Sequence, residues 1–519
     1  MSPPGPRSPS ASASRPGSAQ KIPTALLVVV AVLFVLVYVG VAVARMSYPY
    51  ELEWIEGGLL QAMSRVLDGR PLYVKPSLEY VPFNYPPLYP WIAALVSKGT
   101  GDGFLPLRLT SFLASLGAFV VAGWLVWRET GRLLAATLTV GLLAATYRIS
   151  GAWFDVARAD SLYLFLLLGG FTTLRLDRTP WRSPLIAGAL FTLAFLAKQS
   201  AAMVVLPLLI HLAWTQRMRF LVFAGALTVG IGGTTLLLDR MSSGWYRYFL
   251  FVAPARHPVE AARVFDYWPR DIFMPMGLAL LIGAAYLLQP RPAAAAGDEV
   301  PAAPSGQWFY AAMLAGTLLS SWFHRMFPGG YDNVLMPAYA TIAIVFGLGV
   351  HAGLRWLAEL PGDDSRRLAT ALQVAIALQL LALAYNPLAQ IPTDSDRTVG
   401  DRFVEKLRST PGRVLIPSHP YLVRLAGKPD HFHEMAFVAV VEIAKGDVER
   451  ELVAELEQAV RDTAYSTVVL STRGWLGSTI RTGYDPATNL FTDPEAFWPV
   501  TGMRTRPEYV YLPRRPAAR

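Results

Sequence analysis

Residues 48–58 read YPYELEWIEGG and follow directly on an apolar run from Ile22 to Ala44. That run has about 23 residues, and a helix needs roughly 20 to cross the hydrocarbon core of a bilayer. The apolar region of a signal peptide is shorter, about 7 to 15 residues, so we expect a retained first transmembrane helix with its N-terminus in the cytoplasm. Three carboxylates, Glu51, Glu53 and Glu56, then lie within six residues of one another, among aromatic residues. Anchoring and packing alone do not explain this segment, which predicts a reactive site at a membrane surface.

The composition indicates that most of the chain lies in lipid. Of its 519 residues, 53% are hydrophobic and 16% are charged, whereas soluble domains carry about 25% charged residues. The chain has no cysteine, which excludes disulfides and thiolate metal sites. Its formal charge of +9 is largely carried by short loops between apolar runs, where it sets orientation in the membrane. We therefore expect membrane lipid around the protein and no nucleic-acid partner.

Ten further apolar runs follow the first one. They cover residues 104–127, 131–149, 160–176, 184–198, 200–214, 219–238, 272–289, 308–323, 333–358 and 368–386. Together with the first run they predict a mostly α, polytopic membrane protein with a bundle of about 11 transmembrane helices. The segment Leu88 to Val96 is apolar but too short to span, so we expect an interfacial or re-entrant helix there.

The charges between these runs predict the orientation. With the N-terminus in the cytoplasm, every inner loop carries arginine, as the positive-inside rule requires. These arginines are Arg128, Arg132, Arg175, Arg178, Arg182, Arg217, Arg219, Arg291, Arg355, Arg366 and Arg367. An odd number of spans then places the C-terminus outside the cytoplasm.

Four regions follow from this organisation. Residues 1–21 are rich in Ser, Pro and Ala and predict a disordered cytoplasmic tail. Residues 22–386 form the transmembrane domain, in which residues 46–91 are an extracytoplasmic first loop. Residues 387–519 contain two short apolar segments typical of strands, 413–416 and 466–470, and an amphipathic helix over 448–463. They predict a small extracytoplasmic α/β domain, whose role the sequence does not reveal.

Polar groups from distant parts of the chain fall on the same face in this topology. They lie at the outer ends of the predicted spans or in the outer loops, as do Glu51, Glu53 and Glu56. This set comprises Asp155, Arg158, Asp160, Lys198, Arg256, His257, Tyr331 and Asn333. A random distribution would have placed them on both faces.

Carboxylates and cations at the outer edge of a helix bundle suit a sugar carried on a polyprenyl phosphate. Its phosphate leaves without acid assistance, so an enzyme needs cations to neutralise it and one carboxylate to accept the proton of the acceptor. Arg158, Lys198, Arg256 and His257 are the candidate phosphate ligands, and the fork of an arginine can bind two phosphate oxygens at once. Aromatic rings in the first loop can stack on a sugar.

Four motifs give the chain a resemblance to a known superfamily. They are the acidic segment after the first span, the Gly-x-x-Leu-Tyr turn at Gly69–Tyr73, the Tyr-Pro-Pro-Leu segment at Tyr85–Leu88, and the Arg-x-Asp segment at Arg158–Asp160. In this combination residues 22–390 resemble the GT-C glycosyltransferases. Within them the chain is most similar to the protein O-mannosyltransferase and aminoarabinose-transferase-like group, also called glycosyltransferase family 39.

The resemblance implies a function and roles for individual residues. Such enzymes transfer a sugar from a polyprenyl phosphate at the outer membrane face, invert the anomeric centre, and in this group use no metal or other cofactor. Glu53 matches the catalytic carboxylate of the first loop, although Trp54 follows where the family has a second acid, and the register among the three glutamates is open. Asp160 matches the aspartate of the second loop. We expect Trp54, Tyr85, Asp155, Tyr331 and Asn333 to contact the sugar or the acceptor, which is an unidentified glycan, lipid or protein.

Other interpretations remain open at this point. Asp160 and Arg158 could be a structural ion pair, Lys198 could reach from a helix end to the interface, and the arginines of the outer loop could be ordinary surface charges. A transporter or lipid flippase would place its ionisable groups near the middle of the bilayer rather than at span ends. A non-catalytic scaffold for envelope assembly is the third alternative. His419, His431, His433 and Glu434 match no standard metal-binding spacing.

Overall fold

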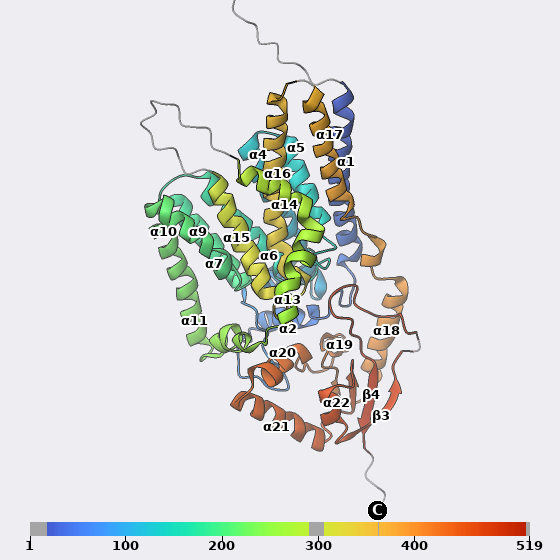
Figure 1. Cartoon of the computed structure of the whole chain (residues 1–519). Helices are drawn as coiled ribbons and strands as arrows, with labels where there is room; N and C mark the ends of the chain where they lie inside the picture. The colour runs from blue at the N-terminus through green and yellow to red at the C-terminus, as the bar shows by residue number, and fades with distance from the viewer. Residues whose placement is uncertain (1–17, 290–305, 362, 492, 515–519) are drawn as a thin grey trace, which may run out of the picture.

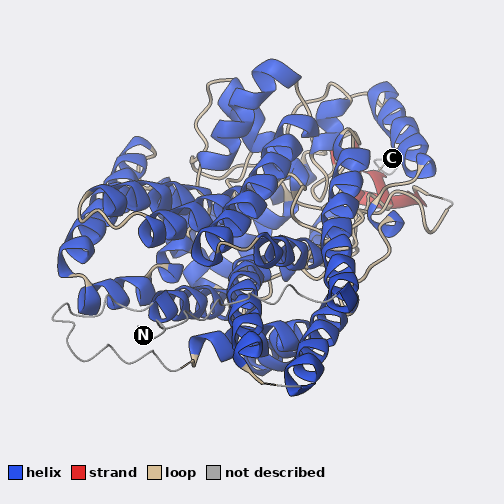
Figure 2. Ribbon diagram, turned by 90° about the horizontal axis from the view of Figure 1, so that it is seen from above, coloured by secondary structure: helices blue, strands red, loops and turns tan. Residues whose placement is uncertain are grey.

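The computed structural model describes residues 18–289, 306–361, 363–491 and 493–514. Long helices form a bundle, and a small sheet with shorter helices lies at one end of it (Figure 1). In the perpendicular view the strands lie toward one side of the molecule, near the C-terminus (Figure 2). The prediction of a mostly helical chain with a small sheet is confirmed.

Each of the apolar runs coincides with helical structure. The bundle contains α1 (Ser18–Met46), α4 (Phe104–Thr130), α5 (Leu133–Ala145), α6 (Asp160–Leu176), α7 (Arg182–Ala197), α8 (Ala201–Val204), α9 (Leu206–Thr215), α10 (Arg217–Leu227), η1 (Thr228–Gly232), α11 (Gly233–Met241), η4 (Tyr267–Phe273), α14 (Met274–Leu287), α15 (Gly306–Arg325), α16 (Met336–Glu359) and α17 (Asp363–Leu381). Its centre is α16, in which residues 336–350 are all buried. A helix that is apolar on every side requires neighbours all round, which this position provides.

The predicted count of 11 transmembrane helices is not confirmed. Among the described residues, five helical stretches are long and apolar enough to cross a membrane: Thr24–Met46, Phe104–Thr130, Arg217–Met241, Ala261–Leu287 and Asp332–Glu359. The other runs form shorter or more polar helices. The 13 residues of α5 extend only about 20 Å at 1.5 Å per residue, less than a hydrocarbon core of about 30 Å. Charged residues occupy the first turns of α17.

The first loop contains two helices, α2 (Glu56–Leu67) and α3 (Leu88–Thr100). The second covers the short apolar segment for which a non-spanning helix was predicted. Ten of the twelve residues of α2 are buried, because α2 lies between the bundle and the C-terminal region (Figure 1). A predicted surface loop is therefore an internal layer of the molecule.

A second group of helices lies at the end of the bundle that carries the sheet (Figure 1). Before residue 336 these are α12 (Trp245–Arg247), η2 (Tyr248–Val252), η3 (Pro254–Arg256), α13 (Ala261–Asp266) and η5 (Asp332–Leu335). After the bundle they are η6 (Leu388–Gln390), α18 (Asp394–Ser409), α19 (Tyr421–Leu425), α20 (Glu434–Val438), η7 (Ala439–Ala444), α21 (Asp447–Arg461) and α22 (Trp475–Ile480). The side chains of Thr393 and Asp396 form a capping box that fixes the start of α18.

The C-terminal sheet has four strands in the order β1-β2-β4-β3. Their bounds are β1 (Val414–Leu415), β2 (Thr467–Leu470), β3 (Tyr484–Asn489) and β4 (Tyr509–Pro513). The pair β1 and β2 is parallel, and β4 runs antiparallel to both β2 and β3. The two strands and the helix predicted from the sequence coincide with β1, β2 and α21. The predicted tail over residues 1–21 lies largely outside the described residues, and α1 begins at Ser18.

Candidate active site

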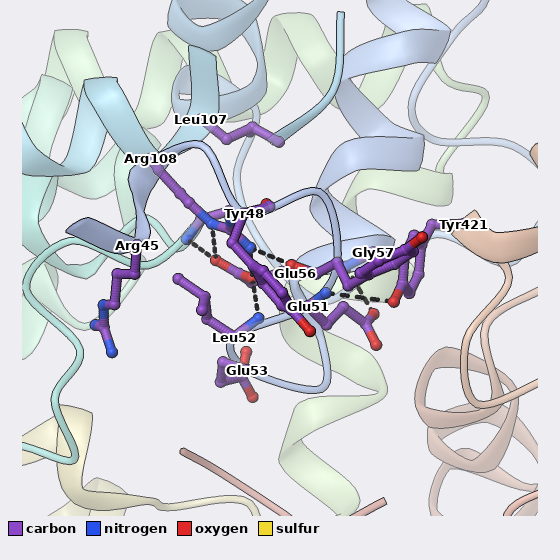
Figure 3. Close-up of polar contacts among 12 residues, drawn as sticks. Arg45, Tyr48, Glu51, Leu52, Glu53, Glu56, Gly57, Leu107, Arg108 and Tyr421 are labelled. Carbon is purple, nitrogen blue, oxygen red and sulfur yellow. Dashed lines mark hydrogen bonds and ion pairs between the residues drawn. The ribbon is translucent and has the colours of Figure 1, made fainter. Parts of the chain in front are cut away.

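The segment 51–57 folds on itself because its own carboxylates accept backbone N–H groups. Leu52 N–H donates to Glu56 Oε2 over 2.7 Å, Gly57 N–H to Glu51 Oε1 over 3.0 Å, and Ile55 N–H to Glu53 Oε2 over 3.2 Å. A Cβ atom at Gly57 would collide with Glu51 Oε1 and the Tyr421 ring. The position thus needs glycine, and the tight turn holds the three glutamates in different directions (Figure 3).

Glu56 is the centre of a buried ion pair with Arg108 of α4. Arg108 donates to both carboxylate oxygens, over 3.0 Å from Nε and 2.6 Å from a terminal nitrogen. Ala157 N–H donates to Glu56 Oε1 over 2.6 Å, and both charged side chains are fully buried. With its oxygens accepting from two backbone amides and a forked guanidinium, Glu56 joins the first loop to α4 and to the α5–α6 connection.

Glu51 faces the C-terminal region. One of its carboxyl oxygens lies 2.5 Å from Nδ1 of His419, with both side chains buried. Burial raises the pKa of Glu51 and lowers the pKa of His419 to about 3. Both shifts favour the uncharged forms, so the contact is a hydrogen bond from a protonated carboxyl to a neutral imidazole.

Glu53 has a different environment. Arg158 donates to Glu53 Oε2 over 2.9 Å and to the Tyr85 hydroxyl over 2.6 Å, and its guanidinium lies 5.5 Å from the centre of the Trp153 ring. The other oxygen of Glu53, Oε1, is buried and has no hydrogen-bond partner among the described residues. Burial raises the pKa of Glu53 to about 7, against the opposing charge of Arg158. In Figure 3, Glu53 lies apart from the Glu56–Arg108 contacts.

Asp160 organises a second polar group at the start of α6. Lys198 Nζ lies 2.5 Å from Asp160 Oδ1, and Asn333 Nδ2 donates to the same oxygen over 2.9 Å. Next to Lys198, Gln199 donates to the backbone oxygen of Asn84, over 3.0 Å. Asn84 directly precedes Tyr85 in the first loop. This group therefore joins three connections of the bundle to the first loop. Because Arg158 and Asp160 are two residues apart, the two groups adjoin.

The C-terminal region covers the Glu53 turn. Thr501 N–H donates to Leu52 O over 3.1 Å, and residue 53 pairs with Thr501 in an isolated parallel bridge. A Cβ atom at Gly502 would lie 3.0 Å from Glu53 Oε1 and 2.9 Å from the Trp54 ring. His433 Nε2 lies 3.3 Å from the backbone oxygen of Trp54. The turn is therefore enclosed by groups more than 370 residues further along the chain.

The structure places one of the remaining predicted site residues near Glu53 and Arg158, and gives the others partners elsewhere. Tyr331 is close to the site, with its ring 6.2 Å from the Trp153 ring. Asp155 instead accepts two hydrogen bonds from Arg45, both over 2.7 Å. Arg256 donates to the backbone oxygens of Ala444, the last residue of η7, and of Lys445, the latter over 3.2 Å. His257 Nδ1 lies 3.2 Å from the backbone oxygen of Pro254.

Three parts of the site were not predicted from the sequence: Arg108, the contact of His419, and the turn at Thr501–Gly502. Arg108 is an arginine near the start of a predicted span, which is a common position for an interfacial charge. His419 was singled out only as one of several histidines. A charged residue within an apolar helix is a functional or structural signal by default, and that rule would have selected Arg108.

Comparison with known proteins finds one family model that matches part of the chain and several solved structures with a similar fold. Residues 84–237 match the family model described as dolichyl-phosphate-mannose-protein mannosyltransferase. No curated protein matches the sequence. Crystal structures of ArnT from Cupriavidus metallidurans, in the apo state and bound to undecaprenyl phosphate, have similar folds, with TM-scores of 0.60 and 0.61 at 13% identity. Each similarity covers 92% of this chain and 97% of the ArnT chain.

A more distant similarity is found to the Archaeoglobus fulgidus oligosaccharyltransferase tethered with an acceptor peptide. Its TM-score is 0.50 at 11% identity, and the similarity covers 89% of this chain and 72% of that one. The match over residues 84–237 and the fold shared with ArnT agree with the resemblance drawn from the four sequence motifs.

Proposed function

We propose that the protein transfers a sugar from a polyprenyl phosphate to an acceptor hydroxyl, with Glu53 as the general base. The observation that carries this proposal is the buried Oε1 of Glu53, which has no partner among the described residues and lies beside Arg158. The fold shared with an ArnT structure bound to undecaprenyl phosphate supports the donor class. Of the three glutamates, Glu53 alone combines a free oxygen with a pKa close to neutrality.

The reaction follows from these groups. The acceptor oxygen attacks the anomeric carbon as the bond from that carbon to the phosphate oxygen breaks, and the acceptor proton passes to Glu53 Oε1. A base is most effective when its pKa is close to the working pH, and the pKa of about 7 meets this condition. Attack on the side opposite the phosphate inverts the anomeric centre.

The leaving phosphate needs positive charge. Arg158 uses one N–H of each terminal nitrogen for Glu53 and Tyr85, which leaves three of its five N–H donors, including that of Nε, for phosphate oxygens. The ammonium of Lys198 has three N–H donors, of which Asp160 uses one. We assign phosphate binding to these two cations and the orientation of Lys198 to Asp160 and Asn333. Arg256, whose donors face backbone oxygens, is a weaker candidate.

We assign roles to the other aromatic and acidic residues of the site from the groups that they contact. Tyr85, Trp54 and Tyr331 surround the Glu53–Arg158 pair and offer rings for the sugar or the acceptor. Glu51 and Glu56 hold the catalytic turn through His419 and Arg108. Asp155 has the same kind of structural role through Arg45.

The topology is also part of the proposal. We place the N-terminus in the cytoplasm and the site and the C-terminal region outside it. The arginines of the predicted inner loops support this orientation, and the α16–α17 connection lies at the end of the bundle opposite the sheet (Figure 1).

The proposal is tested by transfer of a radiolabelled sugar from synthetic polyprenyl-phosphate donors, with the purified protein in nanodiscs. Glu53→Gln should lower turnover by at least about 100-fold, because it removes the base and keeps the shape. Asp102→Asn, at an exposed position in the α3–α4 connection, is the matched control and should keep full turnover. Full transfer by Glu53→Gln would reject Glu53 as the base, and the absence of turnover by the folded wild type with every donor would reject the donor class.

A further inference from the structure

A second polar cavity lies on the side of α2 that faces the C-terminal region. Its volume is about 520 Å³. Its walls come from α2 and the turn after it, from the approach to β1, and from α19 with the residues that follow. Neither the base nor the proposed phosphate ligands line it, so it is separate from the site described above.

The walls of this cavity carry more positive than negative charge. The cations are Arg65, Arg70, Arg413, Arg424 and Lys428, and the acids are Glu79 and Asp430. Asp430 already serves two cations, Arg424 over 3.0 Å and Arg70 over 3.8 Å. Arg70 also pairs with Asp68, outside the wall, over 3.4 Å. Five cations against these three acids leave a surplus of two positive charges.

One of these cations, Arg65, is not an ordinary solvated surface charge. Arg65 is 9% exposed, and it uses Nε and one terminal nitrogen for the backbone oxygen of Pro71, over 3.1 and 2.8 Å. Its guanidinium lies 3.9 Å from the centre of the Tyr80 ring. Burial lowers the pKa of Arg65, and the nearby charge of Arg70 lowers it further. A buried cation repelled by its neighbour gains free energy when an anion enters.

An unpaired acceptor points to the same conclusion. Gln61, which also lines the cavity, is 5% exposed. Its amide nitrogen donates to the backbone oxygen of His431 over 3.0 Å, which fixes the orientation of the amide. Its Oε1 is buried without a hydrogen-bond partner among the described residues. Leaving such an oxygen unpaired costs free energy, and a ligand hydroxyl would satisfy it.

We propose that this cavity binds a phosphate monoester carried by the acceptor, with a neighbouring sugar hydroxyl donating to Gln61 Oε1. A phosphate is favoured because the cations come from several separate segments and so surround the space, and the oxygens of a phosphate point in several directions. This assignment rests on the proposed function, because only a glycosyltransferase has an acceptor to position. Gln61 is five residues beyond the start of α2, about 8 Å along the helix axis. Glu53 precedes the start of α2 by three residues, so a short oligosaccharide held here would extend along α2 toward the base.

Isothermal titration of glucose 1-phosphate into the full-length protein in phosphatidylcholine nanodiscs tests the site, with glucose as the uncharged control ligand. Arg70→Glu and Arg413→Glu, both at exposed positions on the cavity wall, should each weaken glucose 1-phosphate binding at least tenfold. Arg450→Glu, at an exposed arginine of α21 outside the cavity, should leave the affinity unchanged. Equal affinity in all three variants, no binding to the wild type, or equal binding of glucose would each overturn the proposal.

Two further experiments identify the source of the phosphate and separate the cavity proposal from the proposal that Glu53 is the base. Nanodiscs containing phosphatidylglycerol should not compete with glucose 1-phosphate, and competition that Arg70→Glu removes would assign the cavity to lipid headgroups instead. Glu53→Gln should bind glucose 1-phosphate as the wild type does. If Glu53→Gln retained sugar transfer, Glu53 would be rejected as the base, and the result of the glucose 1-phosphate titration would be unaffected. If glucose 1-phosphate did not bind, the cavity proposal would fail, and the turnover result for Glu53 would be unaffected.

Discussion

At the scale of single residues, three glutamates in one turn have three different environments. Glu56 is neutralised by Arg108, Glu51 is paired with a neutral histidine, and Glu53 keeps one oxygen free beside Arg158. The three side chains are chemically identical, so the difference comes from their partners, which lie mostly elsewhere in the chain. Reactivity at this site is therefore decided by what is left unpaired.

The pKa of Glu53 predicts the acid limb of the pH–rate profile. The base must be ionised, so kcat/KM should fall as the pH drops through about 7. Arg158 lowers the pKa of Glu53 by its charge, so Arg158→Gln should move the acid limb to higher pH in addition to reducing the rate. Profiles of kcat/KM for the two proteins check this. A limb at the same pH in both would show that Arg158 does not tune the base.

The raised pKa of Glu53 also affects folding stability. Activity should rise as the pH rises through this pKa, whereas stability should fall. The folded pKa lies above the ordinary value of 4.5, so the contribution of Glu53 to stability is present below pH 4.5 and is lost as the pH rises through about 7. Glu53→Gln should therefore unfold at a higher temperature than the wild type at pH 8 and at a similar temperature at pH 4.5. Thermal unfolding in detergent at the two pH values measures the difference, and equal midpoints at pH 8 would contradict it.

Glu56 should matter for stability rather than for chemistry. Glu56→Ala leaves the buried guanidinium of Arg108 without its carboxylate, and breaking a buried pair costs about 3–5 kcal/mol. The control is Glu495→Ala, which removes the exposed pair with Arg504 and should cost less than about 1 kcal/mol. Thermal unfolding of the two variants compares the losses. Similar midpoints would mean that the Glu56–Arg108 pair does not hold the first loop to α4.

At the scale of elements, the helices were predictable and their contacts were not. Apolar runs located the helices because burial and lipid both select apolar side chains, but the same runs do not distinguish a spanning helix from the 13-residue α5. Arg158, Asp160 and Lys198 were placed together correctly because helix ends on one face must adjoin. The partners Arg108 and His419 were not predicted, since they lie 52 and 368 residues from the glutamates they contact. Only the packing of the C-terminal region on α2 brings His419 to Glu51.

The turn at Gly502 offers a test of this packing. Gly502 has φ of +77°, and an added Cβ would press on Glu53 and Trp54. Gly427 has a similar φ of +72° and nothing within 4 Å of an added Cβ. Gly502→Ala and Gly427→Ala should therefore carry a similar backbone cost of about 1–2 kcal/mol, but only Gly502→Ala should reduce turnover, by about tenfold or more. Equal turnover in the two variants would show that the C-terminal region does not position Glu53.

At the scale of the whole molecule, the site lies in a layer between the helix bundle and the C-terminal region (Figure 1). This arrangement suits a donor whose lipid tail stays in the bilayer while its sugar meets an acceptor from outside. It requires that the sheet and α18 lie on the extracytoplasmic side and that the α16–α17 connection lie in the cytoplasm. The orientation of the whole chain is thus the broadest claim that the proposed function makes.

The absence of cysteine makes that orientation directly measurable. Ser409→Cys at the end of α18 and Asp363→Cys at the start of α17 each introduce a single exposed thiol at opposite ends of the molecule. In sealed right-side-out membrane vesicles, a membrane-impermeant maleimide should label Ser409→Cys at once, and Asp363→Cys only after detergent is added. The two residues are 46 positions apart with α17 between them, so labelling of both in sealed vesicles would mean that α17 does not cross the membrane. The reverse labelling pattern would place Glu53 on the cytoplasmic side, and the acceptor would then have to be a cytoplasmic molecule.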